Sequence, residues 1–141
     1  MAGASDAASM LGTVPFFSSL DEKKRKALVS EGKEMFFKVG NPIVGEGTMG
    51  VGFYLILDGR AEVRKGGRVL ATLEKGQFFG EMSLIDNQPR SADVVAVSPT
   101  KCWALTSWAF TALVKTNPDV ALLMLKELVK RLRAAQSSPT A

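Results

Sequence analysis

The chain has 141 residues, of which 46% are hydrophobic and 23% are charged, and it contains no histidine and one cysteine. This length suits one domain that buries about two-thirds of its unfolded surface, while the missing histidine excludes Ser-His-Asp triads, most zinc and non-haem iron sites and histidine-ligated haem. We therefore predict no metal site and, because the lone Cys102 cannot form an internal disulfide, a reduced thiol in a cytoplasmic protein or in the cytoplasmic domain of a larger protein.

The ends of the chain carry little pattern. Residues 1–14 have neither the basic start nor the apolar stretch of a signal peptide, so we predict a flexible N-terminal tail. The domain is expected over residues 15–136, followed by a flexible tail over residues 137–141. No membrane segment is expected in this chain, because its longest apolar run, Val120 to Leu125, is far below the roughly 20 residues that a membrane span needs.

A helix is predicted at the start of the domain. Ser19 is a suitable cap for a helix over Leu20 to Glu31, and Asp21 and Glu22 would lie in its first turn. Gly32 would follow its end. The basic cluster inside this segment is most simply a solvated helix face, so the net charge of +4 does not by itself indicate a nucleic-acid partner.

The middle of the chain reads as short strands, because turn signals recur there about every ten residues. This spacing favours an antiparallel sandwich or a jelly-roll barrel. The predicted strands cover Glu34 to Val39, Phe53 to Leu57, Ala61 to Arg64, Val69 to Leu73, Ala92 to Val97 and Cys102 to Thr106.

Two helices are predicted at the C-terminal end. Ser107 would cap one that runs to Lys115, and Asn117 would cap the next, which starts with Pro118 and runs to Gln136. The apolar positions of this final helix are wider than one stripe. Three explanations stay open: simple packing on the barrel, contact with a second copy of the helix, or cover for a ligand.

One segment carries chemistry of its own. Gly80 allows a close backbone approach, and the following residues can form one helical turn whose free N–H groups attract an anion. Glu81 would accept a hydrogen bond from a sugar hydroxyl. Arg90 follows a rigid turn, and its guanidinium matches phosphate oxygens, with the Ser91 hydroxyl beside it. Together these residues predict recognition of a phosphate and a ribose.

This segment also resembles a known motif. Phe79-Gly80-Glu81-Met82-Ser83-Leu84, a short spacer and Pro89-Arg90-Ser91-Ala92 together resemble the phosphate-binding cassette of the cyclic-nucleotide-binding domain family, which includes the catabolite activator, cyclic-nucleotide-regulated channels and kinase regulatory subunits. Val51 departs from the family pattern, where an acid is frequent. The resemblance extends over Pro15 to Leu20 and over Gly47, Gly50, Phe53, Tyr54, Ile56, Gly59, Ala61 and Val63.

The resemblance implies an α+β fold: an eight-stranded antiparallel β jelly roll flanked by an N-terminal helix and two C-terminal helices. It implies a regulatory sensor of cAMP rather than an enzyme, with no catalytic residues and no cofactor. The final helix, 117–136, would act as a lid over the ligand. It would also offer a contact for a homodimer or an effector protein.

The resemblance further implies a role for each site residue. Gly80 and Glu81 would bind the ribose, while Arg90, Ser91 and the amides of Met82 and Ser83 would hold the cyclic phosphate. The base would be lined by Val63, Leu73 and Arg131. Ser91 resembles cAMP-type members, and cGMP is the alternative ligand.

Other functions fit the chain less well. A transcription factor of the catabolite-activator type needs a helix-turn-helix of about twenty further residues after Gln136, so we expect no nucleic-acid partner for this chain. A cupin-type metalloenzyme on a similar jelly roll would need histidine ligands. A degenerate domain that keeps the fold and binds only protein is the remaining alternative.

Overall fold

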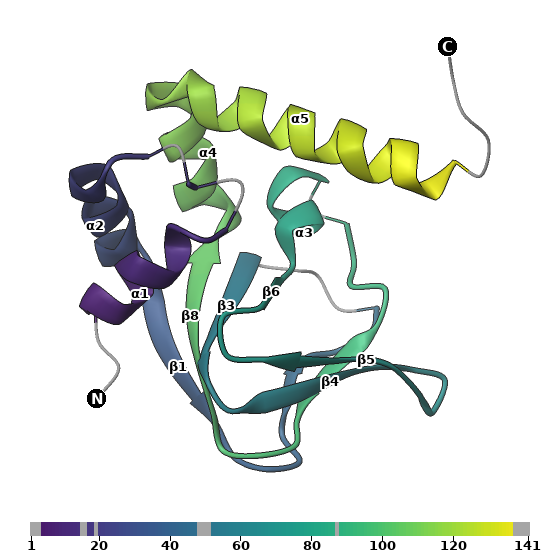
Figure 1. Ribbon diagram of the computed structural model, residues 1–141. Helices are drawn as coiled ribbons and strands as arrows, with labels where there is room; N and C mark the ends of the chain where they lie inside the picture. Colours follow the sequence, from purple (N-terminus) through teal and green to yellow (C-terminus); the bar gives the residue numbers. More distant parts are fainter. Residues whose placement is uncertain (1–3, 15–16, 19, 48–51, 87, 137–141) are drawn as a thin grey trace.

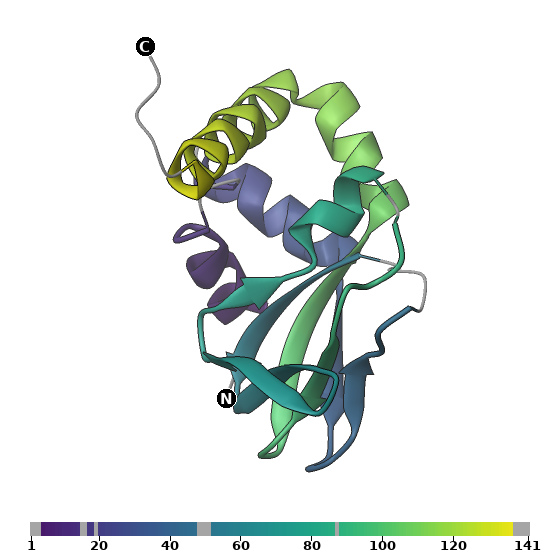
Figure 2. The ribbon, with the colours of Figure 1, turned by 90° about the vertical axis from the view of Figure 1, so that its right-hand side faces the viewer.

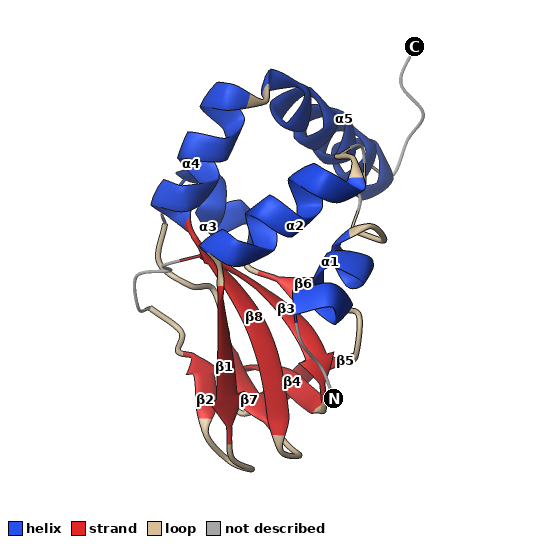
Figure 3. Ribbon diagram, turned by 90° about the vertical axis from the view of Figure 1, so that its left-hand side faces the viewer, coloured by secondary structure: helices blue, strands red, loops and turns tan. Residues whose placement is uncertain are grey.

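The structure is a computed structural model that describes residues 4–14, 17–18, 20–47, 52–86 and 88–136 (Figure 1). The strands form a barrel-like body and the helices gather at one end of it (Figure 3). The described helices are α1 (Ala4–Leu11), α2 (Glu22–Glu31), α3 (Glu81–Asp86), α4 (Ser107–Thr116) and α5 (Pro118–Ala135).

Eight strands form two four-stranded antiparallel sheets, which confirms the predicted α+β jelly roll. One sheet has the order β1-β8-β3-β6, and the other has the order β2-β7-β4-β5. Their bounds are β1 Lys33–Phe37, β2 Pro42–Val44, β3 Gly52–Asp58, β4 Arg60–Lys65, β5 Arg68–Glu74, β6 Phe78–Phe79, β7 Asp93–Ala96 and β8 Thr100–Thr106.

Six of these strands coincide with predicted segments, and β2 and β6 had no counterpart among them. With three and two residues, both are too short to show the alternation of side chains that reveals a strand. β6 nevertheless has a precise place, because it pairs with β3 in the register Tyr54 with Phe79 and Leu55 with Phe78.

The prediction of a flexible tail over residues 1–14 is wrong for residues 4–14. This segment contains helix α1, and Ala7, Ala8, Leu11 and Val14 are buried in the core that α1 and α2 share with β3 and β8. Ala7 and Ala8 are small and common in loops as well as in cores, so the segment has no strong apolar pattern in the sequence, yet it packs against α2 and β3.

Trp103 joins this helical layer to the barrel. Its side chain on β8 is buried, and its Nε1 donates a hydrogen bond of 3.1 Å to the carbonyl oxygen of Val29 in α2. Gly32 lies directly against the indole ring, where a Cβ would overlap it. The predicted stop of the helix at Gly32 is therefore also a packing requirement of Trp103.

The helix starts differ slightly from the predicted caps. Asp21 caps α2 and accepts a hydrogen bond of 2.8 Å from the backbone N–H of Lys24, whereas Ser19 lies outside the described residues. Thr106, rather than Ser107, caps α4, and its hydroxyl accepts from the N–H of Ala109 at 3.3 Å. In the part of the chain that the structure describes, no helix is both long and apolar enough to span a membrane.

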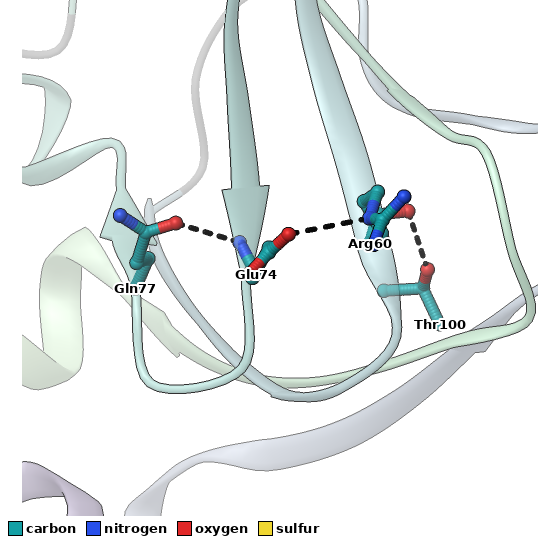
Figure 4. A network of polar contacts seen from close by, with 4 residues as sticks. All are labelled: Arg60, Glu74, Gln77 and Thr100. Atoms are coloured by element: carbon teal, nitrogen blue, oxygen red, sulfur yellow. Dashed lines mark hydrogen bonds and ion pairs between the residues drawn. The ribbon is translucent and has the colours of Figure 1, made fainter.

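A polar network lies at the other end of the barrel (Figure 4). Arg60 Nε lies 3.4 Å from Glu74 Oε1, and Gln77 Oε1 accepts from the Glu74 N–H at 2.7 Å. Thr100 Oγ1 donates to the carbonyl oxygen of Arg60 at 3.1 Å. These contacts hold the β4–β5 hairpin to β8 at the end of the barrel away from α4.

Candidate functional site

A cavity of about 410 Å³ opens between the β4–β7 wall and the segment around α3. Its walls are apolar where strands contribute and polar where the segment after α3 contributes. It is lined by Val44, Val63, Val94, Phe78 and Phe79, and by Gly80, Asp86, Gln88, Pro89, Arg90, Ser91 and Ala92. The structure therefore brings the predicted residues Gly80, Arg90, Ser91 and Val63 together around one cavity.

Arg90 is the cation of this cavity, and its residue is only 8% exposed. Its Nη2 donates a hydrogen bond to the carbonyl oxygen of Gly52 at the start of β3. Its Cζ lies 5.8 Å from the centroid of the Tyr54 ring. The Arg90 carbonyl oxygen accepts from the N–H of Gly47 at 2.8 Å. Both the backbone and the side chain of Arg90 are thus fixed by residues far away in the sequence.

Gly80 supplies the space that Arg90 occupies. Its φ is +88°, a conformation that L side chains rarely adopt. A Cβ at this position would approach both Arg90 Nη1 and the Gly52 carbonyl oxygen to 2.5 Å. In this structure the group that lies closest to Gly80 is the Arg90 guanidinium, and the predicted close approach of a ligand to the Gly80 backbone remains a prediction.

Helix α3 follows directly after Gly80. The N–H of Leu84 donates to the carbonyl oxygen of Gly80 at 3.3 Å, and the Leu84 side chain is buried in the helical core. Glu81, Met82 and Ser83 form the first turn of α3. Their backbone is described and their side chains lie outside the description, so the predicted contacts of Glu81 with ribose remain a prediction.

The turn after α3 leads the chain back to the cavity. The N–H of Gln88 donates to Asp86 Oδ1 at 3.0 Å, which folds the chain over the end of the helix. Asn87, part of the predicted turn, lies outside the described residues. Ser91 follows Arg90 and lines the cavity beside it.

The predicted base-lining residues are spread more widely. Val63 lines the cavity, whereas Leu73 packs against the core cluster of Ile56 and Ala61 and is not among the lining residues. Arg131 lies on α5, with its Nε 3.4 Å from Glu127 Oε1, and it is also absent from the lining. The base contacts of Leu73 and Arg131 therefore remain predictions.

Tyr54 was not predicted as a site residue, and Phe79 was predicted only as the first residue of the cassette motif. Their rings are stacked, with centroids 5.1 Å apart and planes 9° apart. Burial raises the pKa of the Tyr54 phenol, and the positive charge of Arg90 opposes that rise. The sequence signal was present in the apolar strand and in the Phe-Phe pair before Gly80, but only the β3–β6 pairing shows that they meet.

The chemistry of the cavity is that of an anion site with an apolar wall. The Arg90 guanidinium, the Ser91 side chain and the backbone N–H groups after Gly80 together offer several hydrogen-bond donors to one phosphate. Val44, Val63 and Val94 offer contact to a flat apolar group. A nucleotide of one phosphate combines both features.

Comparison with known proteins gives the same result. Residues 34–117 match the family described as "Cyclic nucleotide-binding domain". The chain is 37% identical over 113 residues to the "cAMP-dependent protein kinase regulatory subunit" of Schizosaccharomyces pombe, a match that covers 79% of this chain and 27% of that protein. It is 39% identical over 92 residues to the "cGMP-dependent protein kinase" of Toxoplasma gondii, with 65% and 9% covered.

A solved structure extends the likeness to the fold. The catabolite activator protein of Thermus thermophilus superposes with a TM-score of 0.76 and 36% identity, covering 86% of this chain and 59% of that chain. The chain thus spans about a quarter or less of the two kinase-related proteins and under two-thirds of the activator. The family match covers more than half of the chain and includes every residue of the cavity, and the chain therefore belongs to the cyclic nucleotide-binding domain family.

Proposed function

We propose that this domain is a sensor of cAMP that works by binding and not by catalysis, with cGMP as the alternative ligand. The observation that carries the proposal is the buried Arg90 at the edge of the 410 Å³ cavity, next to Ser91 and Gly80. Ser91 favours cAMP by its resemblance to cAMP-type members. The similar proteins include both cAMP- and cGMP-dependent kinases, so the family alone leaves the base open.

The phosphate would bind at Arg90 and Ser91. Arg90 would exchange its contact with the Gly52 carbonyl oxygen for the anion or share its N–H groups between the two. The amides of Met82 and Ser83, at the start of α3, would add donors to the phosphate, and Glu81 and Gly80 would bind the ribose. A cyclic phosphate has one negative charge, which matches the one guanidinium of the cavity.

The lid role of α5 is supported by the space beneath it. In Figures 1 and 2, α5 crosses above α3. A second, mostly apolar hollow of about 440 Å³ lies between α3, α4 and α5, lined among others by Leu84, Phe110, Met124 and Leu128. A movement of α5 toward α3 would fill this hollow, and it would carry Arg131 toward a base bound in the first cavity.

Exposed apolar side chains on α5 offer a contact for a second copy of the chain, and one of them, Leu125, also lines the hollow beneath the helix. Leu122, Leu125, Val129 and Leu132 are all about half exposed. Their spacing of three, four and three residues is that of the a and d positions of a coiled coil. We propose that the chain forms a homodimer through this face. If the chain is found to be a monomer, that result would favour binding of a separate effector protein at this face instead.

Titration calorimetry with cAMP, cGMP and 5′-AMP tests the proposed function. We expect cAMP to bind most tightly, cGMP more weakly and 5′-AMP weakest, because the open phosphate carries a second charge and a different shape. A reversed order of the two cyclic nucleotides would establish cGMP as the ligand. Absence of binding by both would overturn the proposal in favour of a domain that contacts only protein.

A further inference from the structure

We propose that Tyr54 is a positioning residue that holds Arg90 and the start of the cassette at a fixed separation, so that the guanidinium is ready for an anionic phosphate. This inference rests on the proposed function. Three groups are layered: the Arg90 guanidinium, the Tyr54 ring and the Phe79 ring. The Arg90 Cζ lies 5.8 Å from the Tyr54 centroid, and the Tyr54 and Phe79 centroids are 5.1 Å apart.

The layered groups join the two ends of the cassette, residues 79–92. Phe79 directly precedes Gly80, and Arg90 lies near the other end, ten residues beyond Gly80. Tyr54 comes from neither end, because it lies on β3 and pairs with Phe79 across the β3–β6 ladder. A single ring from the barrel therefore contacts a residue near each end of the cassette.

The barrel fixes the Tyr54 ring independently of the cassette. The residue is 5% exposed and belongs to the second core cluster with Ile56 and Cys102. On the opposite side of β3 its partner in β8 is Ala104, whose small side chain leaves room for an aromatic ring. The ring is thus a rigid surface, and the longer and more flexible Arg90 side chain is the part that it orders.

The Gly52 carbonyl oxygen completes the arrangement. It accepts a hydrogen bond from Arg90 Nη2, and it lies two residues before Tyr54 on the same strand. β3 thus contacts Arg90 twice, once through a polar atom and once through an aromatic face. A guanidinium over an aromatic face in a desolvated site is stabilised by both attractions.

The proposal uses the face of the ring and not its hydroxyl. A phenylalanine keeps the aromatic face, so Tyr54→Phe should bind cAMP like the wild type. Tyr54→Leu removes the aromatic face and should bind cAMP more weakly. The matched control is Phe53→Leu, which removes an aromatic ring from the neighbouring position of β3 that faces the helical core instead. Both leucine substitutions should lower stability, so thermal unfolding is measured for each variant. The cAMP affinities are then compared at a temperature below the lower of the two unfolding midpoints.

The first experiment measures cAMP affinity by displacement of a fluorescent cyclic nucleotide. We expect Tyr54→Leu to weaken binding by about threefold to thirtyfold, while Tyr54→Phe and Phe53→Leu stay within about twofold of the wild type. In an Arg90→Gln background, Tyr54→Leu should add less than about a twofold loss, since the positioned group is gone. Equal losses in both backgrounds, or a loss in Tyr54→Phe as large as in Tyr54→Leu, would overturn the inference.

A second experiment needs no nucleotide and separates the inference from the proposed function. The Tyr54 ring current should shift the side-chain proton resonances of Arg90 upfield in the nucleotide-free protein, with Arg90→Gln used to assign them. The shift should persist in Tyr54→Phe and disappear in Tyr54→Leu. If the wild type binds no cyclic nucleotide yet shows this shift, the proposed function fails while Tyr54 still positions Arg90. Unshifted Arg90 resonances in the wild type would refute the positioning role itself.

Discussion

The guanidinium of Arg90 occupies the space where a side chain of Gly80 would be. A Cβ on Gly80 would lie 2.5 Å from Arg90 Nη1, and the φ of Gly80 is +88°. Two separate requirements therefore select glycine at this position: the backbone conformation and the volume of the neighbouring cation. They can be separated by experiment, because Gly76 has the same φ of +88° with nothing within 4 Å of its Cβ position.

We expect Gly80→Ala to lower both stability and cAMP affinity. The positive φ alone costs about 1 to 2 kcal/mol for an L residue, and Gly76→Ala should show this cost alone in urea unfolding. Gly80→Ala should cost more, because the methyl group also displaces Arg90. Calorimetry should find weaker cAMP binding only in Gly80→Ala. Matching losses of stability in the two variants, with affinity intact in both, would refute the steric part.

Arg90→Ala should reduce cAMP affinity by about 2 to 4 kcal/mol, which corresponds to some thirtyfold to a thousandfold, because it removes a charge-assisted contact to the phosphate. Titration calorimetry measures the loss. Arg60→Ala is the matched control, since this exposed arginine lies at the opposite end of the barrel in the network of Figure 4. Unchanged affinity in Arg90→Ala would remove Arg90 from the phosphate site.

The ribose contact of Glu81 predicts a preference for the 2′-hydroxyl. The wild type should bind 2′-deoxy-cAMP about tenfold or more weakly than cAMP, because a hydrogen bond to a carboxylate is lost. In Glu81→Ala the two ligands should bind with similar affinity. Competition against a fluorescent cyclic nucleotide measures all four values. Equal affinity of the wild type for both ligands would exclude this role.

Cys102 should be unreactive in the folded protein. The residue is fully buried, and burial raises the pKa of its thiol from 9.0 to about 12. We expect iodoacetamide at pH 8.5 to alkylate the folded chain at least about a hundredfold more slowly than the unfolded chain, because both access and thiolate fraction fall. Cys102→Ala gives the background rate. Rapid labelling of the folded wild type would contradict this burial.

The raised pKa of the Cys102 thiol also makes the stability of the fold depend on pH. Between pH 9 and 12 the thiol stays protonated in the folded state and loses its proton in the unfolded state, so stability falls as the pH rises through this range. The raised pKa of the Tyr54 phenol acts in the same direction. Urea unfolding of Cys102→Ala should show a smaller alkaline loss than the wild type, and an identical loss would show that the thiol does not contribute.

The apolar face of α5 predicts the oligomeric state. By light scattering at high micromolar concentration, the wild type should have about twice the monomer mass of 15.1 kDa, and Leu122→Glu should be monomeric, because a carboxylate cannot be buried in an apolar seam. Val69→Glu is the control, since Val69 is similarly exposed on β5. A monomeric wild type would refute the dimer.

The features that depend on local sequence pattern were mostly predicted correctly. Strands β3, β4, β5 and β8 were predicted from their composition and from the turns between them, and Gly80, Arg90 and Ser91 lie in one continuous segment. The buried role of α1 escaped prediction because Ala7 and Ala8 look alike in a tail and in a core. Tyr54 escaped because its contact with Arg90 joins residues 36 positions apart, a relationship that only the sheet register creates.

The helical core has a consequence for where this domain can be cut. The family match covers residues 34–117, yet more than half of the residues of the helical core lie outside it, on α1, on α2, in the segment that joins these two helices and in the first half of α5. Trp103, which lies inside the match, gives its indole hydrogen bond to Val29, which lies outside. A fragment trimmed to the recognisable motif would keep the phosphate-binding residues and lose the surface that the indole packs against, so the minimal folding unit is larger than the minimal recognisable one.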